Sequence, residues 1–98
     1  MKKREFLITI EPTRPDLEAT MGLEEQRVVG EHFEHLKDLH GKGVVLFVGR
    51  TTGEKNLRGL IVVTAADKAE AQAILEADPA AQAGIFRGRV DEFKVILK

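Results

Sequence analysis

The sequence contains no cysteine, no tryptophan and no tyrosine, and only three of its 98 residues are proline. Without cysteine the chain can form neither disulfide bonds nor thiolate metal sites. The missing Trp and Tyr side chains argue against a surface that stacks nucleic-acid bases. The first apolar segment, residues 6–10, is too short for a signal peptide or a membrane span. We therefore expect a cytoplasmic protein that binds neither nucleic acid nor a membrane.

Charge of one sign is also lacking. Fifteen basic and sixteen acidic residues are scattered along the chain and give a net charge near −1, which makes a polyanionic partner improbable. The composition is 43% apolar and 32% charged, as in an ordinary globular protein. The length fits a single domain over residues 1–98 with a modest core, which an association partner would help to stabilise.

The spacing of apolar residues predicts six elements in the order βαββαβ. Residues 6–10 alternate with a period of two, whereas 23–40 follow a helical period that ends at two glycines. The remaining predicted elements are a loop over 12–23, a strand over 44–48, a turn over 51–56, a strand over 57–64, a second helix that begins after Asp67 and stops before Asp78, and a last strand that carries Val90, Phe93, Val95 and Leu97, with a bulge near Val90.

This order in about 100 residues predicts an α+β protein with the ferredoxin-like split βαβ arrangement. Its four-stranded antiparallel sheet carries both helices on one face. The second and third strands are apolar on both sides, so the uncovered sheet face should be apolar as well. We therefore expect a homodimer that packs sheet against sheet.

His32 is the first candidate for chemistry. On a helical projection it falls between Val28 and Leu36, toward the sheet, with His40 in the apolar sector and His35 at its margin. A buried imidazole needs partners for its ring nitrogens. His32 is therefore either a structural core histidine with satisfied hydrogen bonds or a functional group.

Asp78 is the second candidate. Asp78 followed by Pro79 is typical of a helix N-terminus, and Gly84 would end the short helical turn. A capping carboxylate next to a buried imidazole could also fix the tautomer of His32 and raise its basicity, which is the arrangement that a general base needs. Both interpretations can hold together.

A metal site is the less favoured interpretation of the three histidines. A helix brings imidazoles at positions i and i+3 together, as in His32 and His35, but His40 projects about 80° away from His32. Residues 41–43 lack the spacing and the hydroxyl residue of a P-loop. We expect no native metal ion and no cofactor.

The ordered set of His32, Gly43, Gly49, Asp78-Pro79 and Gly84 on this frame resembles the YCII-related family of the dimeric α+β barrel superfamily. The segments EHFEHLKDLHGKGVVLFVG and AEAQAILEADPAAQAG carry the likeness, which covers roughly residues 28–97. The resemblance implies a ferredoxin-like homodimer with a pocket near the dimer interface and a histidine–aspartate pair as its catalytic centre, here His32 and Asp78. Known members include dehydrochlorinases of chlorinated hydroquinone breakdown, and the superfamily holds muconolactone isomerases; both move a proton without a metal.

The sequence departs from that family pattern at two positions. Arg50 stands where a proline usually follows the glycine, and Ala80 stands where an aromatic residue usually follows Asp-Pro. Arg50 could bring a cation to an acidic ligand or could simply be a solvated residue at a strand end. Ala80 would leave the space of the aromatic ring empty.

Two functions from different classes remain. The first is a cofactor-independent lyase or isomerase, for example a dehydrochlorinase, in which His32, oriented by Asp78, removes a proton from a small organic acid or phenol. Arg50 and Thr51 are its candidate substrate-binding residues. The alternative is a non-catalytic dimeric module that binds a small ligand or a protein and keeps His32 and Asp78 as a structural pair. A cofactor-free monooxygenase of the same superfold is a third possibility.

Overall fold

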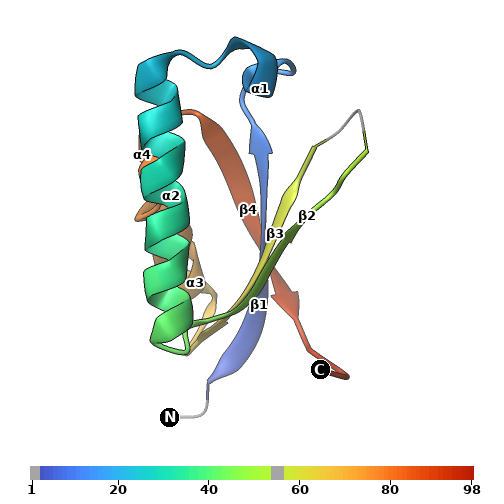
Figure 1. Ribbon diagram of the computed structural model, residues 1–98. Helices are drawn as coiled ribbons and strands as arrows, with labels where there is room; N and C mark the ends of the chain where they lie inside the picture. The colour runs from blue at the N-terminus through green and yellow to red at the C-terminus, as the bar shows by residue number, and fades with distance from the viewer. Residues whose placement is uncertain (1–2, 54–56) are drawn as a thin grey trace.

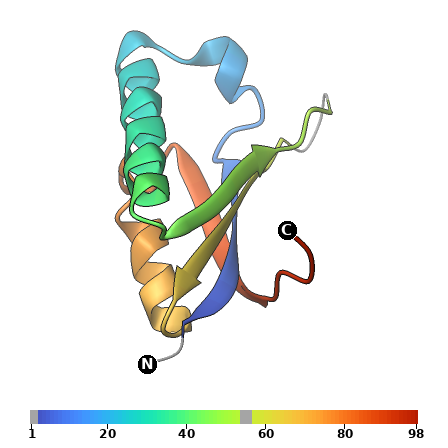
Figure 2. The same cartoon turned by 60° about the horizontal axis from the view of Figure 1, so that its bottom comes forward.

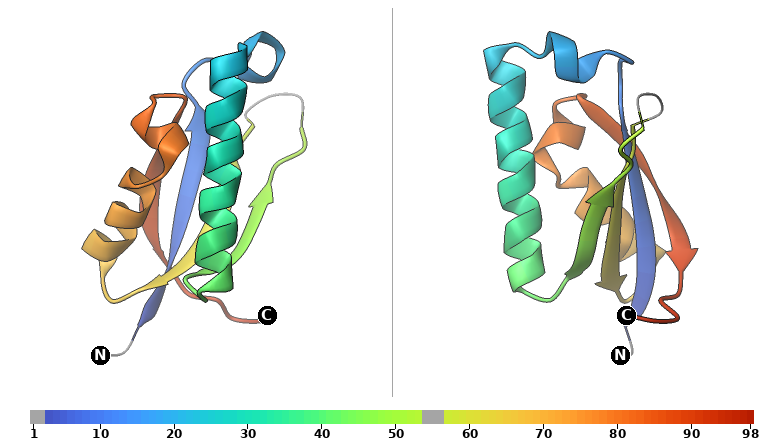
Figure 3. Two further views of the ribbon diagram at one scale, coloured as in Figure 1. Left: turned by 60° about the vertical axis from the view of Figure 1, so that its left-hand side comes forward. Right: turned by 45° about the vertical axis from the view of Figure 1, so that its right-hand side comes forward.

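One antiparallel sheet, with strand order β2-β3-β1-β4, forms the centre of the computed structural model, which describes residues 3–53 and 57–98 (Figure 1). The elements in chain order are β1 (Arg4–Pro12), α1 (Leu17–Thr20), α2 (Leu23–Gly41), β2 (Val45–Arg50), β3 (Gly59–Ala65), α3 (Lys68–Glu76), α4 (Pro79–Gln82) and β4 (Phe86–Phe93). Helices α2 and α3 lie on the same side of the sheet (Figure 3). The predicted ferredoxin-like α+β fold is confirmed.

Strand β1 occupies the middle of the sheet, between β3 and β4. Its alternation places Phe6, Ile8 and Ile10 on the helix-covered face, where all three are buried. They form the main core with α2, α3 and the inward residues of β3, including Ile61 and Val63. The alternation read from the sequence therefore identifies the buried face of the sheet.

Local interactions set the ends of the long helix α2. At its start, the Glu25 carboxylate accepts a hydrogen bond from the Gly22 N–H at 3.4 Å and two from the Arg14 guanidinium at 2.8 Å each. After its end, Gly43 has φ of 77°, a left-handed conformation that favours glycine. The glycine-rich segment thus turns the chain directly into β2.

The structure corrects two of the predicted segments. The predicted loop over 12–23 contains the short helix α1, whose Leu17 is buried. The last strand starts earlier than expected and ends at Phe93, so Val95 and Leu97 lie beyond it. Gly88 explains why the predicted start of this strand is too late. Thr9 and Leu75 approach Gly88 too closely for a side chain, so the apolar alternation is interrupted there.

The predicted bulge near Val90 is wrong, since β4 pairs with β1 in continuous register. An irregularity lies instead in β2, between Val45 and Phe47. In the predicted turn over 51–56, the Thr51 N–H donates to the Arg58 carbonyl at 2.9 Å; residues 54–56 lie outside the described part of the chain.

The sheet face opposite the helices is apolar over β3 and its immediate neighbours. Leu7 of β1 and Phe47 of β2 both pair with Val62 on this face; Val62 is fully buried, whereas Phe47 is 50% exposed. Toward β4 the same face becomes charged, with Arg89 opposite Thr9. Figure 2 shows the C-terminus on this side of the sheet, away from α2 and α3. The uncovered face is thus apolar over β2 and β3, as predicted, and polar at its β4 edge.

Candidate active site

His32 and Asp78 meet in the interior, although 46 residues separate them in the sequence. His32 lies on the inner side of α2 and is 3% exposed; Asp78 precedes α4 and is 5% exposed. The distance from His32 Nδ1 to Asp78 Oδ2 is 2.5 Å. Such a contact orients the imidazole and favours a proton on Nδ1.

The same Asp78 carboxylate begins helix α4. Its Oδ1 atom accepts a hydrogen bond from the Ala80 N–H at 2.8 Å, and Pro79 occupies the first turn of the helix. One oxygen therefore caps the helix while the other holds His32. This double use fixes the carboxylate, because each bond restricts the rotation that would break the other.

Two phenylalanines hold the His32 ring in place from its sides. Phe33 and Phe86 contact it edge-on, with ring centroids at 5.1 Å and 5.3 Å. Phe86 packs against the main core and also against a smaller cluster of Leu17, Val28, Ala80 and Ile85. The imidazole is thus fixed by packing as well as by its bond to Asp78.

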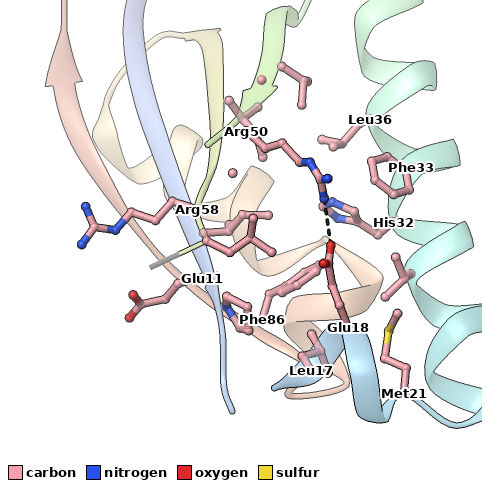
Figure 4. A pocket seen from close by; sticks show the side chains of 18 residues that line it. Glu11, Leu17, Glu18, Met21, His32, Phe33, Leu36, Arg50, Arg58 and Phe86 are labelled. Atoms are coloured by element: carbon pink, nitrogen blue, oxygen red, sulfur yellow. Dashed lines mark hydrogen bonds and ion pairs between the residues drawn. The ribbon is translucent and has the colours of Figure 1, made fainter. Parts of the chain in front are cut away.

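A cavity of about 330 Å³ lies between α1, α2 and the β2-β3 hairpin, and His32 forms part of its wall (Figure 4). Asp78 is not one of the described residues that line it. The other lining residues are mostly apolar: Ile10, Pro12, Leu17, Met21, Val29, Phe33, Leu36, Val48, Gly49, Leu57, Gly59, Ile61 and Phe86, with Glu11, Glu18, Arg50 and Arg58 as the charged members. A buried carboxylate behind a histidine that faces an apolar cavity can orient that histidine for proton transfer.

Arg50 and Glu18 form an ion pair at this cavity. The Arg50 Nη1 atom donates to Glu18 Oε1 at 2.9 Å, and the side chains are 61% and 63% exposed. Arg50 thus lines the cavity, and its role in substrate binding stays a prediction. Sequence reasoning missed Glu18, because α1 has only four residues and too short a period to signal a helix.

Glu11 contributes a fixed negative charge on the β1 side of the cavity. Its carboxylate accepts a hydrogen bond from Arg87 at 2.8 Å, and this contact lowers the pKa of Glu11 below its ordinary value. In Figure 4 the side chains of Glu11 and Arg58 point away from His32. Glu11 therefore stays ionised at neutral pH without facing the imidazole.

The other residues singled out from the sequence lie elsewhere. Thr51 is exposed, accepts a hydrogen bond from the Arg58 N–H at 2.9 Å, and is not among the described lining residues. Ala80 is fully buried in the smaller cluster, so the expected empty space is filled by core packing. His40 is exposed rather than part of the apolar side; it lies in the last turn of α2. His35 is half-buried, as its marginal position suggested.

Neither a metal-ligand cluster nor a membrane-spanning helix occurs in residues 3–53 and 57–98. Within them, no three His, Asp or Glu side chains are arranged to hold a metal ion. In the same part of the chain, no helix has the length and the apolar character needed to cross a membrane. The predicted cytoplasmic location stays a prediction.

The fold and the buried pair define an α+β protein with a histidine–carboxylate site. The YCII-related domain matches residues 5–94, and the chain belongs to that family. Search of the curated proteins gives no match.

Solved structures resemble the fold at low sequence identity. The chain is similar to 5-chloro-2-hydroxyhydroquinone dehydrochlorinase (TftG) from Burkholderia phenoliruptrix AC1100, solved with 2,5-dihydroxybenzoquinone, with a TM-score of 0.68 and 21% identity over 92% of this chain and 93% of that one. It is also similar to the uncharacterized protein TM1266 from Thermotoga maritima, with a TM-score of 0.59 and 17% identity over 95% of this chain and 100% of that one. At these identities the likeness establishes the fold.

Proposed function

We propose that the protein is a cofactor-independent enzyme that moves a proton on a small organic acid or phenol, with His32 as the base and Asp78 as its positioning partner. The observation that carries the proposal is the double relationship of His32, which lines an apolar cavity while Asp78 holds its Nδ1 atom from behind. With Nδ1 engaged by Asp78, Nε2 is the nitrogen left for a substrate. Asp78 then stabilises the imidazolium that forms when Nε2 takes a proton.

The proton balance allows two reactions. In an elimination, Nε2 takes a proton from the substrate, the freed electron pair forms a new double bond, and a leaving group such as chloride departs with its bonding pair. In an isomerisation, His32 returns the proton to another carbon of the same molecule. The similarity to a dehydrochlorinase supports the first reaction as the one to test first.

Of the two candidates from the sequence, Arg50 is the proposed substrate-binding residue, and Thr51 has a supporting role. Arg50 supports this role by lining the cavity with a guanidinium that can bind an anionic oxygen. Thr51 follows it at the end of β2, where its hydroxyl bonds the backbone of Arg58, another lining residue. We assign Thr51 to shaping the hairpin that carries both arginines.

Homodimerisation through the open sheet face is part of the proposal. Exposed aromatic side chains on this face, Phe47 of β2 and Phe93 of β4, on a sheet whose other face is covered, are typical of a surface that packs against another protein. A second copy presents the same surface, so twofold packing would cover both at once.

The non-catalytic alternative rests on the burial of the pair. His32 and Asp78 are each at least 95% buried, and the capping bond and the two phenylalanine contacts would account for both residues without chemistry. In that case the pair stabilises the fold and the cavity only binds a ligand.

Variants His32→Gln and Asp78→Asn separate the two functions. We would assay them against chlorinated hydroquinones, phenols and lactones, with melting followed by circular dichroism because the chain has no Trp or Tyr. A positioned base predicts that turnover falls at least about 100-fold with a small change in melting temperature. The exposed His40→Gln is the matched control and should keep full turnover. Retained turnover with a strongly lowered melting temperature would instead establish the structural role.

A further inference from the structure

The ion pair between Arg50 and Glu18 joins two separate parts of the cavity wall. Arg50 ends strand β2, Glu18 lies in α1, and 32 residues separate them. Figure 4 shows the two side chains extending toward each other from these elements. Both line the cavity that contains His32.

The ion pair between Arg50 and Glu18 is weak enough for a ligand to replace one of its members. Both side chains are more than 60% exposed, so water and salt screen their attraction and the net stabilisation is small. A guanidinium binds any carboxylate or phenolate of suitable geometry. An anionic ligand can therefore replace the Glu18 carboxylate on Arg50 without breaking a strong interaction.

The other charged lining residues are poorly placed for such an exchange. Glu11 is held by Arg87, and Arg58 points away from His32 in Figure 4. Arg50 is thus a lining cation whose hydrogen-bond partner, Glu18, also lines the cavity. The cavity beyond it is apolar, with Phe33, Phe86 and Met21 among its walls.

The geometry points to Glu18 as a built-in competitor for the anionic group of the ligand. In the structure the Glu18 carboxylate bonds the Arg50 guanidinium. A ligand carboxylate or phenolate takes over this bond when the apolar part of the ligand enters the cavity. A cavity of about 330 Å³ is at the lower end of small-molecule sites and suits a single-ring compound. The ligand class is therefore a single-ring monoanion. The inference rests on the proposed function only for the cavity as the ligand site.

Binding of benzoate and of its neutral analogue benzamide tests this assignment. We would titrate the ¹⁵N-labelled protein with each compound by NMR and follow the amide signals of Phe33 and Phe86. Glu18→Gln should tighten benzoate about two- to fivefold, which is the factor expected from removing an exposed ionic competitor, and should leave benzamide unchanged. Arg50→Gln should weaken benzoate about tenfold. In the Glu18→Gln/Arg50→Gln double variant the gain from Glu18→Gln should disappear.

Glu24→Gln provides the matched control, because it removes the same charge from an exposed carboxylate that pairs with Arg27 on α2. It should not change the affinity for benzoate. The inference is overturned if Glu18→Gln leaves benzoate binding unchanged or weaker, if benzamide or the Glu24→Gln protein shows the same gain, or if no variant binds benzoate at the cavity.

Failure of this inference can be distinguished from failure of the proposed function, because the role of Glu18 is tested by binding and the role of His32 by turnover. A protein that binds benzoate with this pattern but loses no turnover in His32→Gln would keep the role of Glu18 and refute the role of His32. The reverse pattern would keep the base and refute the competitor.

Discussion

His32 and Asp78 are joined by a 2.5 Å contact that ties helix α2 to the first turn of α4. The Asp78 carboxylate uses one oxygen for the imidazole and the other for the Ala80 N–H. The site and a helix start therefore depend on one side chain, and different substitutions of Asp78 should separate these two roles.

Asp78→Ala should destabilise the protein more than Asp78→Asn. Alanine removes both the cap and the partner of a buried imidazole, at a combined cost of about 2–4 kcal/mol. Asparagine keeps a capping oxygen and a hydrogen-bond partner, so its cost should be about 1 kcal/mol. Urea denaturation followed by circular dichroism measures both values. Wild-type stability in both variants would show that neither bond of Asp78 contributes to stability, and equal losses would show that asparagine keeps neither bond.

Gly88→Ala should destabilise the sheet. A methyl group there would lie 2.9 Å from the Thr9 carbonyl oxygen and 3.0 Å from side-chain atoms of Ile10 and Leu75. Relief of this overlap requires backbone movement, which costs about 1–3 kcal/mol. The control is Gly30→Ala in α2, where the methyl group meets no described atom within 4 Å beyond its own helix and should stabilise by about 0.5–1 kcal/mol. A Gly88→Ala protein as stable as wild type would contradict the close approach.

Acid should weaken the start of α2 through Glu25. The hydrogen bonds from Arg14 lower the pKa of Glu25 from its ordinary value of 4.5. A carboxyl whose pKa is lower in the folded state contributes stability above its unfolded pKa, and this contribution is lost as the pH falls through the folded pKa. The stability difference between wild type and Glu25→Gln should therefore be constant at neutral pH and shrink below about pH 4.5. A difference that persists in strong acid would show that the ion pair is not its source.

Phe47→Lys should dissociate the proposed homodimer. A charge at this half-exposed position would be buried against the partner sheet without a counter-charge. Sedimentation velocity should show a dimer for wild type and a monomer for the variant. Leu23→Lys, at the 85% exposed first residue of α2, is the control and should stay dimeric. A monomeric wild-type protein at micromolar concentrations would refute sheet-to-sheet pairing.

Periodicity and capping rules were sufficient to predict much of this structure. The alternation of Phe6, Ile8 and Ile10 and the helical spacing around Leu36 reflect burial, which acts on every residue of a long element. The same spacing predicts that His32 faces inward, and Asp78 before Pro79 predicts a helix cap. Their mutual contact was a hypothesis from the family resemblance, since 46 residues separate them.

The features that sequence reasoning missed depend on short or long-range interactions. Helix α1 has too few residues for a period, so its Glu18 gave no signal and its pairing with Arg50 depends on the tertiary fold. The start of β4 gives no apolar alternation in the sequence, because Gly88 stands at an inward-facing position. The projection of an ideal helix puts His40 in the apolar sector, but a projection does not tell which turns of the helix are covered, and His40 in the last turn is exposed.

The cavity lies at the boundary between two separately packed groups of side chains. Leu36 and Ile61 on one wall belong to the main core, whereas Leu17 and Met21 on the other belong to or pack against the smaller cluster. A group of few side chains has less to lose on opening than the sheet and its helices, so we expect α1 to be the part of the cavity wall that opens most readily. Any widening of the cavity on that side would then depend on the contacts of the smaller cluster more than on those of the main core.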